Sequence, residues 1–492
     1  MANKRYHVST VALLLLAAVL RFHALEQDVR FHPDEALFVS FARQAAVQGD
    51  WLLHGSLDKP PLTIYVNALA LTAFGIRPLP NGVLTLDNRA GEFAVRVSGV
   101  FISLLLVPVM YALAKQLYLG QKQTQNIVSL LITLSPLAIA FSATAFTDGL
   151  MLLCIVIALL MASRRRWLWA GLWLALGFWC KQQALLYLPL VVGIGWVCEY
   201  RIRQPMTVIK ILRFVLPIVL GTILLFIWDA ARGQETSMWT LATVNNDPGR
   251  LIRLDELLPR LAHWWHYGQY LFGAGLVTAV LVIFGGIGLA KHWHTSSSNE
   301  IWIDGMLLAY ILVYGLVHWL VAINIYDRYL LLIAPPVILL IARGISTLTQ
   351  RYNAGVQGFV VLALLVICLP TAWTASEAKL PIGGDGGKHN GIEQVADYLN
   401  SQRLGAIVYD HWLGWELGYY MGTWSDKRRV YYPTPEALAA DALLQADVAP
   451  RYFVVPDWAD AADWLKALRD ANFKVAKTYY QAPFAVYELQ RP

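Results

Sequence analysis

Two acidic side chains, Asp34 and Glu35, follow the first apolar run of the chain, in the stretch RFHPDEALFVSFARQ at residues 30–44. A proline followed by two acids is typical of a helix start, where carboxylates stabilise the unpaired backbone N–H groups and the positive end of the helix dipole. A carboxylate at a helix start beside a membrane is also well placed to act as a general base. Both interpretations can hold at once. His32, in the same stretch, is given no role.

The stretch LDKPPLTIYVNAL at residues 57–69 places Asp58 and Lys59 directly before two prolines. The prolines stiffen the backbone and favour the start of a helix, so Lys59 is expected close to a helix N-terminus. The ammonium group and the helix end would together attract an anion such as phosphate. The alternative is a lysine that only extends its charge out of the hydrocarbon, but this would not explain the adjacent acid or the rigid proline pair.

Further charged residues lie at the ends of later apolar runs. Glu92 and Arg96 have the i, i+4 spacing that permits an ion pair, and Arg96 lies inside an apolar run, where it needs a partner. Singly, each of the remaining residues is explained by anchoring at the membrane interface. Together with the first loop they predict a mixed-charge basin on one face of the membrane, which also contains Asp148, Lys181, Asp327, Arg328 and Tyr329.

His263 and His266, in the stretch HWWHYGQY, are three residues apart and can share one face of a helix. A metal site would also need carboxylates, and Asp58 is the obvious candidate. The alternative, which we favour, is that the histidines belong to an interfacial belt of the Trp and Tyr side chains around them. A divalent metal ion is therefore an open alternative, and no other cofactor is predicted.

These residues belong to a chain with the composition of a membrane protein. Of its 492 residues, 57% are hydrophobic and only 15% are charged, and the mean hydropathy is +0.48. Many apolar runs approach the ~20 residues that a helix needs to cross ~30 Å of hydrocarbon. The four cysteines have no CxxC spacing, so neither a zinc site nor a disulfide framework is indicated. The net charge of +6 resides mostly in short loops and does not indicate nucleic-acid binding.

About eleven membrane-spanning helices are predicted, at residues 8–25, 93–118, 125–145, 148–163, 166–181, 184–200, 209–231, 268–290, 301–323, 328–346 and 355–375. A further apolar run, residues 61–76, is short. If it does not cross and the N-terminus is cytoplasmic, the basic loops all lie inside, in the positive-inside pattern; they carry Lys115, Lys122, Arg164, Arg165, Arg166, Arg201, Arg203, Lys210, Arg213, Lys291, Arg343 and Arg351. We therefore expect residues 26–92 to form an outer segment, with re-entrant or surface-lying helices at 61–76 and 34–50.

The composition changes after Trp373, where the glycine-rich stretch GGDGGKHNG precedes alternating helix and strand patterns. We expect helices in IEQVADYLNSQ, TPEALAADALL and DWLKALRDA, and strands in AIVYD, YFVVP and FAVYEL. The chain is thus divided into a transmembrane domain, residues 1–375, and a small extracytoplasmic α/β domain, residues 376–492. The aromatic stretch YDHWLGWELGYYMG is interpreted as core of the second domain, with contact to the membrane or the site as the alternative.

The motifs taken together resemble those of the GT-C glycosyltransferases, in the family that includes the protein O-mannosyltransferases and the lipid A aminoarabinose transferases. The matching stretches, in the family's order, are HPDEALFVSFARQ, DKPPLTIYVNAL, GEFAVRVSG, FTDGLM and YDRYLLLIAPP. The likeness covers nearly the whole membrane region and weakens in the C-terminal domain. The large insert of the mannosyltransferases is missing, which favours a bacterial enzyme of the inner membrane.

The resemblance implies that a sugar, hexosyl or pentosyl, moves with inversion from a polyprenyl-phosphate carrier to an acceptor hydroxyl on the outer face of the membrane. Asp34 would be the general base, with Glu35 as a second carboxylate, and Lys59 would bind the phosphate. The other implied contacts to the donor are Arg96, Lys181, Arg328 and Tyr329, supported by Asp58, Glu92 and Asp148. The expected partners are the lipid-linked donor, membrane lipids, and an acceptor that is a lipid, a glycan or a protein.

The resemblance also has a departure. In the aminoarabinose transferases, an acid before the lysine and a histidine in a later loop can hold a metal ion. Here the acid is Asp58, and the histidine match is only approximate.

Two functions other than a transferase are also considered. A transporter or lipid flippase usually shows inverted repeats and charges near mid-membrane, whereas here no repeat is evident and the charges collect on one side. A non-catalytic assembly protein would tolerate replacement of Asp34 and Lys59.

Overall fold

The computed structural model describes residues 2–292, 297–444 and 450–491. It divides the chain into two compact units. The first unit contains residues 1–27, 52–63 and 96–383, and the second contains residues 28–51, 64–95 and 384–492. The second unit therefore combines the C-terminal part of the chain with two pieces of the predicted outer segment.

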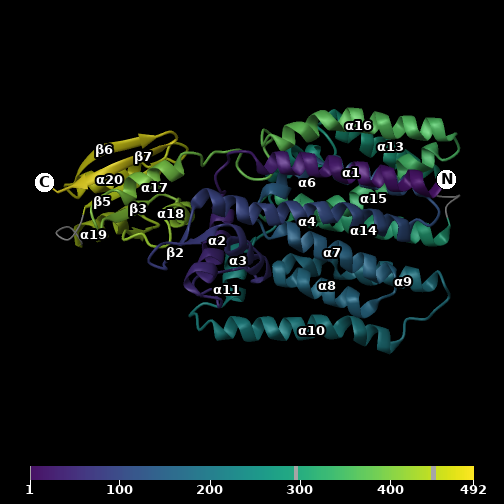
Figure 1. Cartoon of the computed structure of the whole chain (residues 1–492), viewed down its shortest axis with the longest axis horizontal. Coiled ribbons are helices and arrows are strands. Elements are labelled where there is room, and N and C mark those ends of the chain that lie inside the picture. Colours follow the sequence, from purple (N-terminus) through teal and green to yellow (C-terminus); the bar gives the residue numbers. More distant parts are fainter. Residues whose placement is uncertain (1, 293–296, 445–449, 492) are drawn as a thin grey trace. The chain divides into compact units, whose positions relative to one another are not determined.

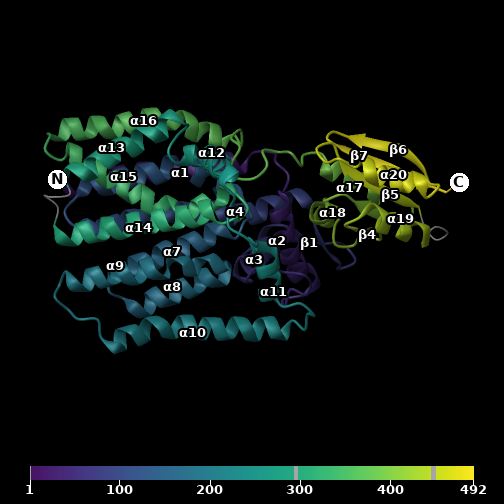
Figure 2. The ribbon, with the colours of Figure 1, turned by 180° about the vertical axis from the view of Figure 1, so that it is seen from behind.

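The first unit is helical, and its long helices run roughly side by side (Figures 1 and 2). The helices of this unit, long and short, are α1 (Ala2–Leu25), most of α4 (Asn88–Leu117), α5 (Lys122–Leu134), α6 (Pro136–Ala140), α7 (Asp148–Ser163), α8 (Trp167–Cys180), α9 (Leu188–Tyr200), α10 (Val208–Ala231), α11 (Met238–Asn246), α12 (Leu257–Gly268), α13 (Leu276–His292), α14 (Ser298–Leu320), α15 (Ala334–Thr349) and α16 (Ala354–Ser376). Short 3-10 turns at Gln182–Tyr187 and Asp327–Leu332 precede α9 and α15.

Each of the eleven predicted spans contains a helix, which confirms a polytopic helical fold. Among the described residues, five helices are long and apolar enough to cross a membrane, or seven if each of two bent pairs is one span. Other predicted spans correspond to shorter apolar helices, such as Asp148–Ser163 and Trp167–Cys180. The ambiguous run at 61–76 forms α3 (Leu62–Phe74), whose 13 residues extend only ~20 Å, less than the hydrocarbon thickness.

Small residues allow some of these helices to approach closely. A Cβ atom on Gly288 of α13 would lie 2.0 Å from the carbonyl oxygen of Gly344 on α15, and one on Gly344 would lie 1.9 Å from the carbonyl oxygen of Gly285. Close backbone approach replaces the hydrophobic driving force that apolar surroundings cannot supply. The sequence at these positions thus fixes α13 against α15.

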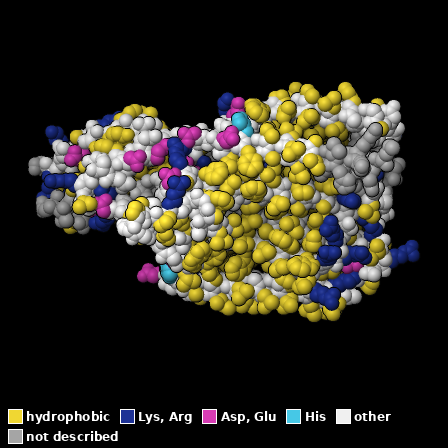
Figure 3. Space-filling view, in the orientation of Figure 1, with side chains coloured by type: hydrophobic (Ala, Val, Ile, Leu, Met, Phe, Trp, Pro, Cys, Tyr) yellow, Lys and Arg dark blue, Asp and Glu magenta, His cyan; other side chains and the backbone are white. Residues whose placement is uncertain are grey.

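Hydrophobic and basic side chains occupy different parts of the surface of the first unit, as the charges of the loops predict. Figure 3 shows a broad band of hydrophobic side chains over the helices, and Lys and Arg side chains gathered at the end where α9 stops and α10 begins. The connection between these two helices carries Arg201 and Arg203. An apolar band with a basic edge is the arrangement of a helical membrane protein.

The second unit contains a five-stranded mixed sheet in the order β4-β3-β5-β7-β6. Strand β3 is parallel to β4 and β5, whereas β7 is antiparallel to β5 and β6. The strands are β3 (Ile407–Asp410), β4 (Arg428–Val430), β5 (Arg451–Pro456), β6 (Lys474–Gln481) and β7 (Phe484–Gln490), with helices α17 (Ile392–Asn400), α18 (Gly414–Tyr420), α19 (Pro435–Leu444) and α20 (Ala462–Asp470). Tyr409 and Phe453 pack with Leu438 and Leu468 of α19 and α20, so these helices share a core with the sheet.

The predicted helices and strands of this region are confirmed, but α18, β4 and β6 were missed. The aromatic stretch is confirmed as core at Tyr419 and Tyr420, which are buried, while Trp412 is 70% exposed. The outer-segment pieces of this unit form α2 (Pro33–Arg43), most of α3, and a hairpin of β1 (Ile76–Pro78) and β2 (Leu84–Leu86).

Candidate functional site

In the first unit, Lys181 and Asp148 form a buried ion pair, with Nζ 2.8 Å from Oδ1. Asp148 is the first residue of α7, where the helix dipole favours a carboxylate. Lys181 follows the last residue of α8 and has an extended backbone (φ −161°, ψ 138°). Both side chains are therefore placed by helix ends.

Other positive charges face Lys181. The charges of Arg328 and Lys59 act on the Lys181 ammonium group, in addition to that of its partner Asp148. The ring of Tyr329 lies under the Lys181 ammonium group, 5.5 Å from Nζ to the ring centre. The structure thus brings together five residues that the sequence had only placed in the same predicted basin.

Asp58 fixes the loop that carries Lys59. Its Oδ2 atom lies 2.5 Å from the Lys59 ammonium group and accepts a hydrogen bond of 3.3 Å from Asn245. Its backbone carbonyl accepts a bond of 2.9 Å from Gln182, the residue after Lys181. Lys59, only 14% exposed in its side chain, is thereby connected through Asp58 to the turn that carries Lys181.

Arg328 lies in the 3-10 turn Asp327–Leu332 and packs its guanidinium over two aromatic rings. The ring centres of Phe146 and Tyr326 are 5.2 and 4.5 Å from Arg328 Cζ. Aromatic faces stabilise a cation and hold its orientation. The turn itself is fixed because Asp327 Oδ2 accepts a hydrogen bond of 2.7 Å from the backbone N–H of Gly383.

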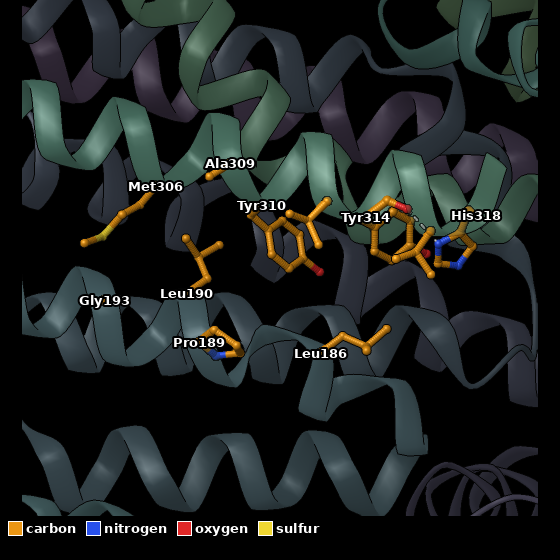
Figure 4. Close-up of a pocket in the computed structure, with 11 residues that line it drawn as sticks. Leu186, Pro189, Leu190, Gly193, Met306, Ala309, Tyr310, Tyr314 and His318 are labelled. Atoms are coloured by element: carbon orange, nitrogen blue, oxygen red, sulfur yellow. Dashed lines mark hydrogen bonds between the residues drawn. The ribbon is translucent and has the colours of Figure 1, made fainter. Parts of the chain in front are cut away.

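An apolar cavity of about 360 Å³ lies between α9 and α14 (Figure 4). Its polar side chains are Tyr310, Tyr314 and His318, all on α14. The His318 ring stacks on Tyr314, with centroids 3.9 Å apart, and meets Tyr329 edge-on at 5.6 Å. One end of the cavity therefore adjoins the ring that lies under Lys181. The remaining lining residues are Leu186, Pro189, Leu190, Gly193, Met306, Ala309, Val313 and Val317.

In the second unit, α2 begins with a capping box. His32 Nδ1 accepts a hydrogen bond of 3.2 Å from the backbone N–H of Asp34, and Glu35 Oε2 accepts one of 3.1 Å from the backbone N–H of His32. This arrangement satisfies donors that a helix start leaves unpaired. Glu35 is buried, whereas Asp34 is partly exposed. His32 thus acquires a structural role, and the two acids have different surroundings.

Glu92 has a partner that its sequence spacing did not indicate. Its two carboxylate oxygens lie 2.9 and 2.7 Å from Nη1 of Arg30, a buried guanidinium. The hydroxyl of Tyr420 donates to Glu92 Oε1 at 2.5 Å. Arg96, four residues further along α4, is also buried. Glu92 therefore serves to join the start of α4 to α18.

The residues considered for a metal site, His263, His266 and Asp58, are not arranged as one. His263 and His266 lie in α12 with ring centroids 6.4 Å apart, and both pack on Tyr267. In the described parts of the chain, no group of three or more His, Cys, Asp and Glu side chains is arranged to hold a metal ion. Asp58 and the two histidines thus do not fit the metal site considered from the sequence, and no step of the chemistry is assigned to one.

Sequence reasoning missed several residues of this arrangement. His318 was detectable, because an ionisable residue inside an apolar run is a functional candidate by default. Asn245 and Gln182 lie in polar stretches next to apolar runs, but nothing in their spacing indicates a common contact with Asp58. Tyr420 lies more than 300 residues from Glu92, so one sequence without relatives could not connect them.

No family model matches the sequence. One similar curated protein is the undecaprenyl phosphate-alpha-4-amino-4-deoxy-L-arabinose arabinosyl transferase of Erwinia tasmaniensis, which is 24% identical over 376 residues. The match covers 71% of this chain and 63% of the length of that relative. The chain thus spans less than two thirds of the curated relative it matches.

Solved structures give a broader likeness. ArnT from Cupriavidus metallidurans, bound to undecaprenyl phosphate, aligns with a TM-score of 0.64 at 13% identity, over 99% of this chain and 98% of ArnT. The Archaeoglobus fulgidus oligosaccharyltransferase aligns with a TM-score of 0.56 at 11% identity, over 98% of this chain and 74% of the enzyme. The expected fold is confirmed: this chain has the GT-C fold of membrane glycosyltransferases, with a small C-terminal α/β domain.

Proposed function

We propose that the chain is an inverting glycosyltransferase that moves a sugar from a polyprenyl-phosphate carrier to an acceptor hydroxyl. The observation that carries this proposal is the position of Lys59, Lys181 and Arg328 near the end of an apolar cavity in a GT-C fold. A phosphate with a long isoprenoid tail needs both a cationic and an apolar surface. The names of the similar proteins agree, since ArnT was solved with undecaprenyl phosphate.

The cations would bind the carrier phosphate. Lys59 is the best placed, because it is partly exposed while Lys181 is buried against Asp148. Arg328 is partly exposed and oriented by its aromatic neighbours. As the sugar leaves, negative charge develops on the phosphate oxygen, and fixed cations in a site of low dielectric stabilise that charge strongly. The isoprenoid tail would lie along the cavity between α9 and α14.

Asp34 would act as the general base. In the proposed step the acceptor hydroxyl gives its proton to the Asp34 carboxylate, and its oxygen forms a bond to the anomeric carbon. The bond from that carbon to the phosphate oxygen breaks, and the electron pair leaves with the polyprenyl phosphate. Attack opposite the leaving group inverts the configuration. The partial exposure of Asp34 supports this role over that of Glu35, which is buried in the capping box.

The proposal includes an orientation. The basic end of the first unit, where α9 meets α10, would face the cytoplasm, and residues 376–492 would lie outside. The donor sugar is proposed to be a pentose such as 4-amino-4-deoxy-L-arabinose, as in the name of the curated relative. The acceptor hydroxyl would belong to a molecule of the bacterial envelope.

The test uses full-length protein in liposomes. Undecaprenyl phosphate-4-amino-4-deoxy-L-arabinose and an undecaprenyl-phosphate hexose are supplied separately, with an extract of bacterial envelope lipids and glycans as acceptor. Release of undecaprenyl phosphate and sugar transfer are measured by mass spectrometry. Transfer should occur with the pentose donor and fall by a factor of about 10² to 10⁴ in Asp34→Asn, the range typical of a lost general base.

The matched control is Asp397→Asn, which neutralises an exposed acid on α17. It should leave transfer unchanged. Near-normal transfer by well-expressed Asp34→Asn would remove Asp34 from the mechanism. Movement of the donor across the bilayer without any new glycosidic bond would instead support a transporter.

A further inference from the structure

We propose that the C-terminal domain positions the catalytic carboxylate, and that Tyr420 and Arg43 are the positioning residues. This inference rests on the proposed function, in which Asp34 acts from the first turn of α2. Its basis is that α18, a helix of the C-terminal domain, is hydrogen-bonded near both ends of α2. Both helices lie within the second unit.

The start of α2 is held by the Tyr420 hydroxyl. The backbone N–H of Phe31 donates to this oxygen at 2.8 Å, and the hydroxyl in turn donates to Glu92 Oε1 at 2.5 Å. Glu92 is itself fixed by the buried guanidinium of Arg30. The hydroxyl thus acts both as a hydrogen-bond acceptor and as a donor. The backbone N–H that it holds, that of Phe31, lies three residues before Asp34.

The end of α2 is held by Arg43, its last residue. Nη1 and Nη2 of Arg43 donate to the carbonyl oxygens of Tyr419 and Gly418 at 2.6 and 2.8 Å. These carbonyls lie in the last turn of α18, where the helix carries negative dipole charge, and the Tyr419 carbonyl also accepts from the backbone N–H of Gly422. Arg43 is only 6% exposed, and the guanidinium also lies over the Tyr419 ring, 5.3 Å from its centre.

Anchors at both ends restrict the tilt and rotation of an 11-residue helix. Because Asp34 is in the first turn, its carboxylate moves with any rotation of α2. A displacement of about 1 Å at a reacting group can cost a factor of ~10² in rate. Removal of the Tyr420 hydroxyl should therefore reduce the rate of the chemical step more than it reduces binding of the donor.

The main variant is Tyr420→Phe, and its matched control is Tyr409→Phe. Tyr409 is a buried tyrosine of the same domain whose hydroxyl donates to Asp441 Oδ2 at 2.7 Å. Both variants lose one hydroxyl that donates to a carboxylate, and Tyr420→Phe also removes the acceptor of the Phe31 backbone N–H, so it should lose at least as much thermal stability as Tyr409→Phe. Only Tyr420→Phe should lower kcat, by roughly tenfold or more, with the KM for the lipid-linked donor unchanged.

Two further readouts separate positioning from general stability. Hydrogen exchange of the amides at residues 31–36 should accelerate in Tyr420→Phe and stay unchanged in Tyr409→Phe. Because Tyr420 acts through Asp34, Tyr420→Phe should have little further effect on the residual transfer of Asp34→Asn. Arg43→Lys, which keeps a charged donor, should retain more activity than Arg43→Met.

The inference is overturned if Tyr420→Phe keeps a normal kcat, or if Tyr409→Phe reduces kcat equally. It is also overturned if the effects of Tyr420→Phe and Asp34→Asn multiply. The failure of the proposed function would look different, because Asp34→Asn alone would then retain transfer. The hydrogen-exchange comparison needs no substrate, so it tests the contact between α18 and α2 in either case.

Discussion

Lys181 and Asp148 are paired at 2.8 Å with less than a tenth of either side chain exposed. A buried pair of this kind is costly to form and more costly to break, since removal of one partner leaves an isolated charge in a poorly solvated site. The pair therefore carries a structural requirement in addition to the proposed contact with phosphate.

Lys181→Met should destabilise the protein by about 3–5 kcal/mol, the usual loss when one partner of a buried pair is removed. The double variant Lys181→Met with Asp148→Leu should recover much of this stability, because no unpaired charge remains. Thermal unfolding in detergent measures both. Binding of undecaprenyl phosphate should stay weak in the double variant. Recovery of binding together with stability would show that Lys181 serves the fold alone.

Lys59→Met should weaken binding of undecaprenyl phosphate by roughly 10- to 100-fold, since a hydrogen bond to a charged group is worth about 1.5–3 kcal/mol. Equilibrium binding of labelled undecaprenyl phosphate to protein in nanodiscs measures the change. Lys379→Met is the matched control, because Lys379 is 66% exposed and pairs with Glu377. Equal affinities for the two variants would place the phosphate away from Lys59.

Glu35→Gln and Glu35→Ala should behave differently. Glutamine keeps an acceptor for the backbone N–H of His32, so the capping box survives, whereas alanine removes it at a cost of about 1 kcal/mol. We expect near-normal transfer by Glu35→Gln and a lower melting temperature for Glu35→Ala. Loss of transfer in Glu35→Gln at normal stability would instead give Glu35 a chemical role.

His389 should make the C-terminal domain less stable at alkaline pH. Burial alone would lower the pKa of His389, but its hydrogen bonds to Asp385 and Glu416 outweigh burial and raise the pKa to about 9, above its usual 6.5. The stabilisation from protonated His389 is therefore complete below pH 6.5 and is lost as the pH rises through 9, at up to about 1.4 kcal/mol per pH unit.

Hydrogen exchange of α17 and β5 between pH 6 and pH 10, corrected for intrinsic rates, measures this loss. His389→Gln should be less stable at neutral pH and show a flatter dependence. His411→Gln is the control, because burial lowers the pKa of His411, whereas the pKa of His389 is raised. An unchanged slope in His389→Gln would assign the pH dependence to other groups.

The sequence was sufficient for the helices of the first unit, because long apolar runs have few alternatives to a helix in a membrane. It also placed Lys59, Asp148, Lys181 and Arg328 in one predicted basin. The basic loops indicate which end of each predicted helix faces the cytoplasm, and these four residues all lie at the opposite ends. Side chains at the same end of a helical bundle lie within a small region, so they are expected to be near one another. The structure then supplied the pairings that this reasoning left open.

The misses include short elements and contacts between distant parts of the chain. Strand β4 has three residues and α18 has seven, too short for a periodic pattern to stand out. Arg30 binds Glu92 from a separate segment of the chain, a contact that the spacing of Glu92 and Arg96 did not indicate. Contacts such as Arg43 with α18 join residues over 370 positions apart, and local propensity contains no information about them.

The long separation between α2 and α18 has a consequence for biosynthesis. The carbonyl that receives Arg43 is made 376 residues after it, which at ~5–20 residues per second means about 20–75 s of translation. During that time α2 has left the ribosome but lacks its hydrogen bonds to α18, while the intervening helices enter the bilayer. A nascent chain would thus hold Asp34 in an unfixed helix until α18 has been made and has folded against α2. Activity would not be acquired before that contact forms.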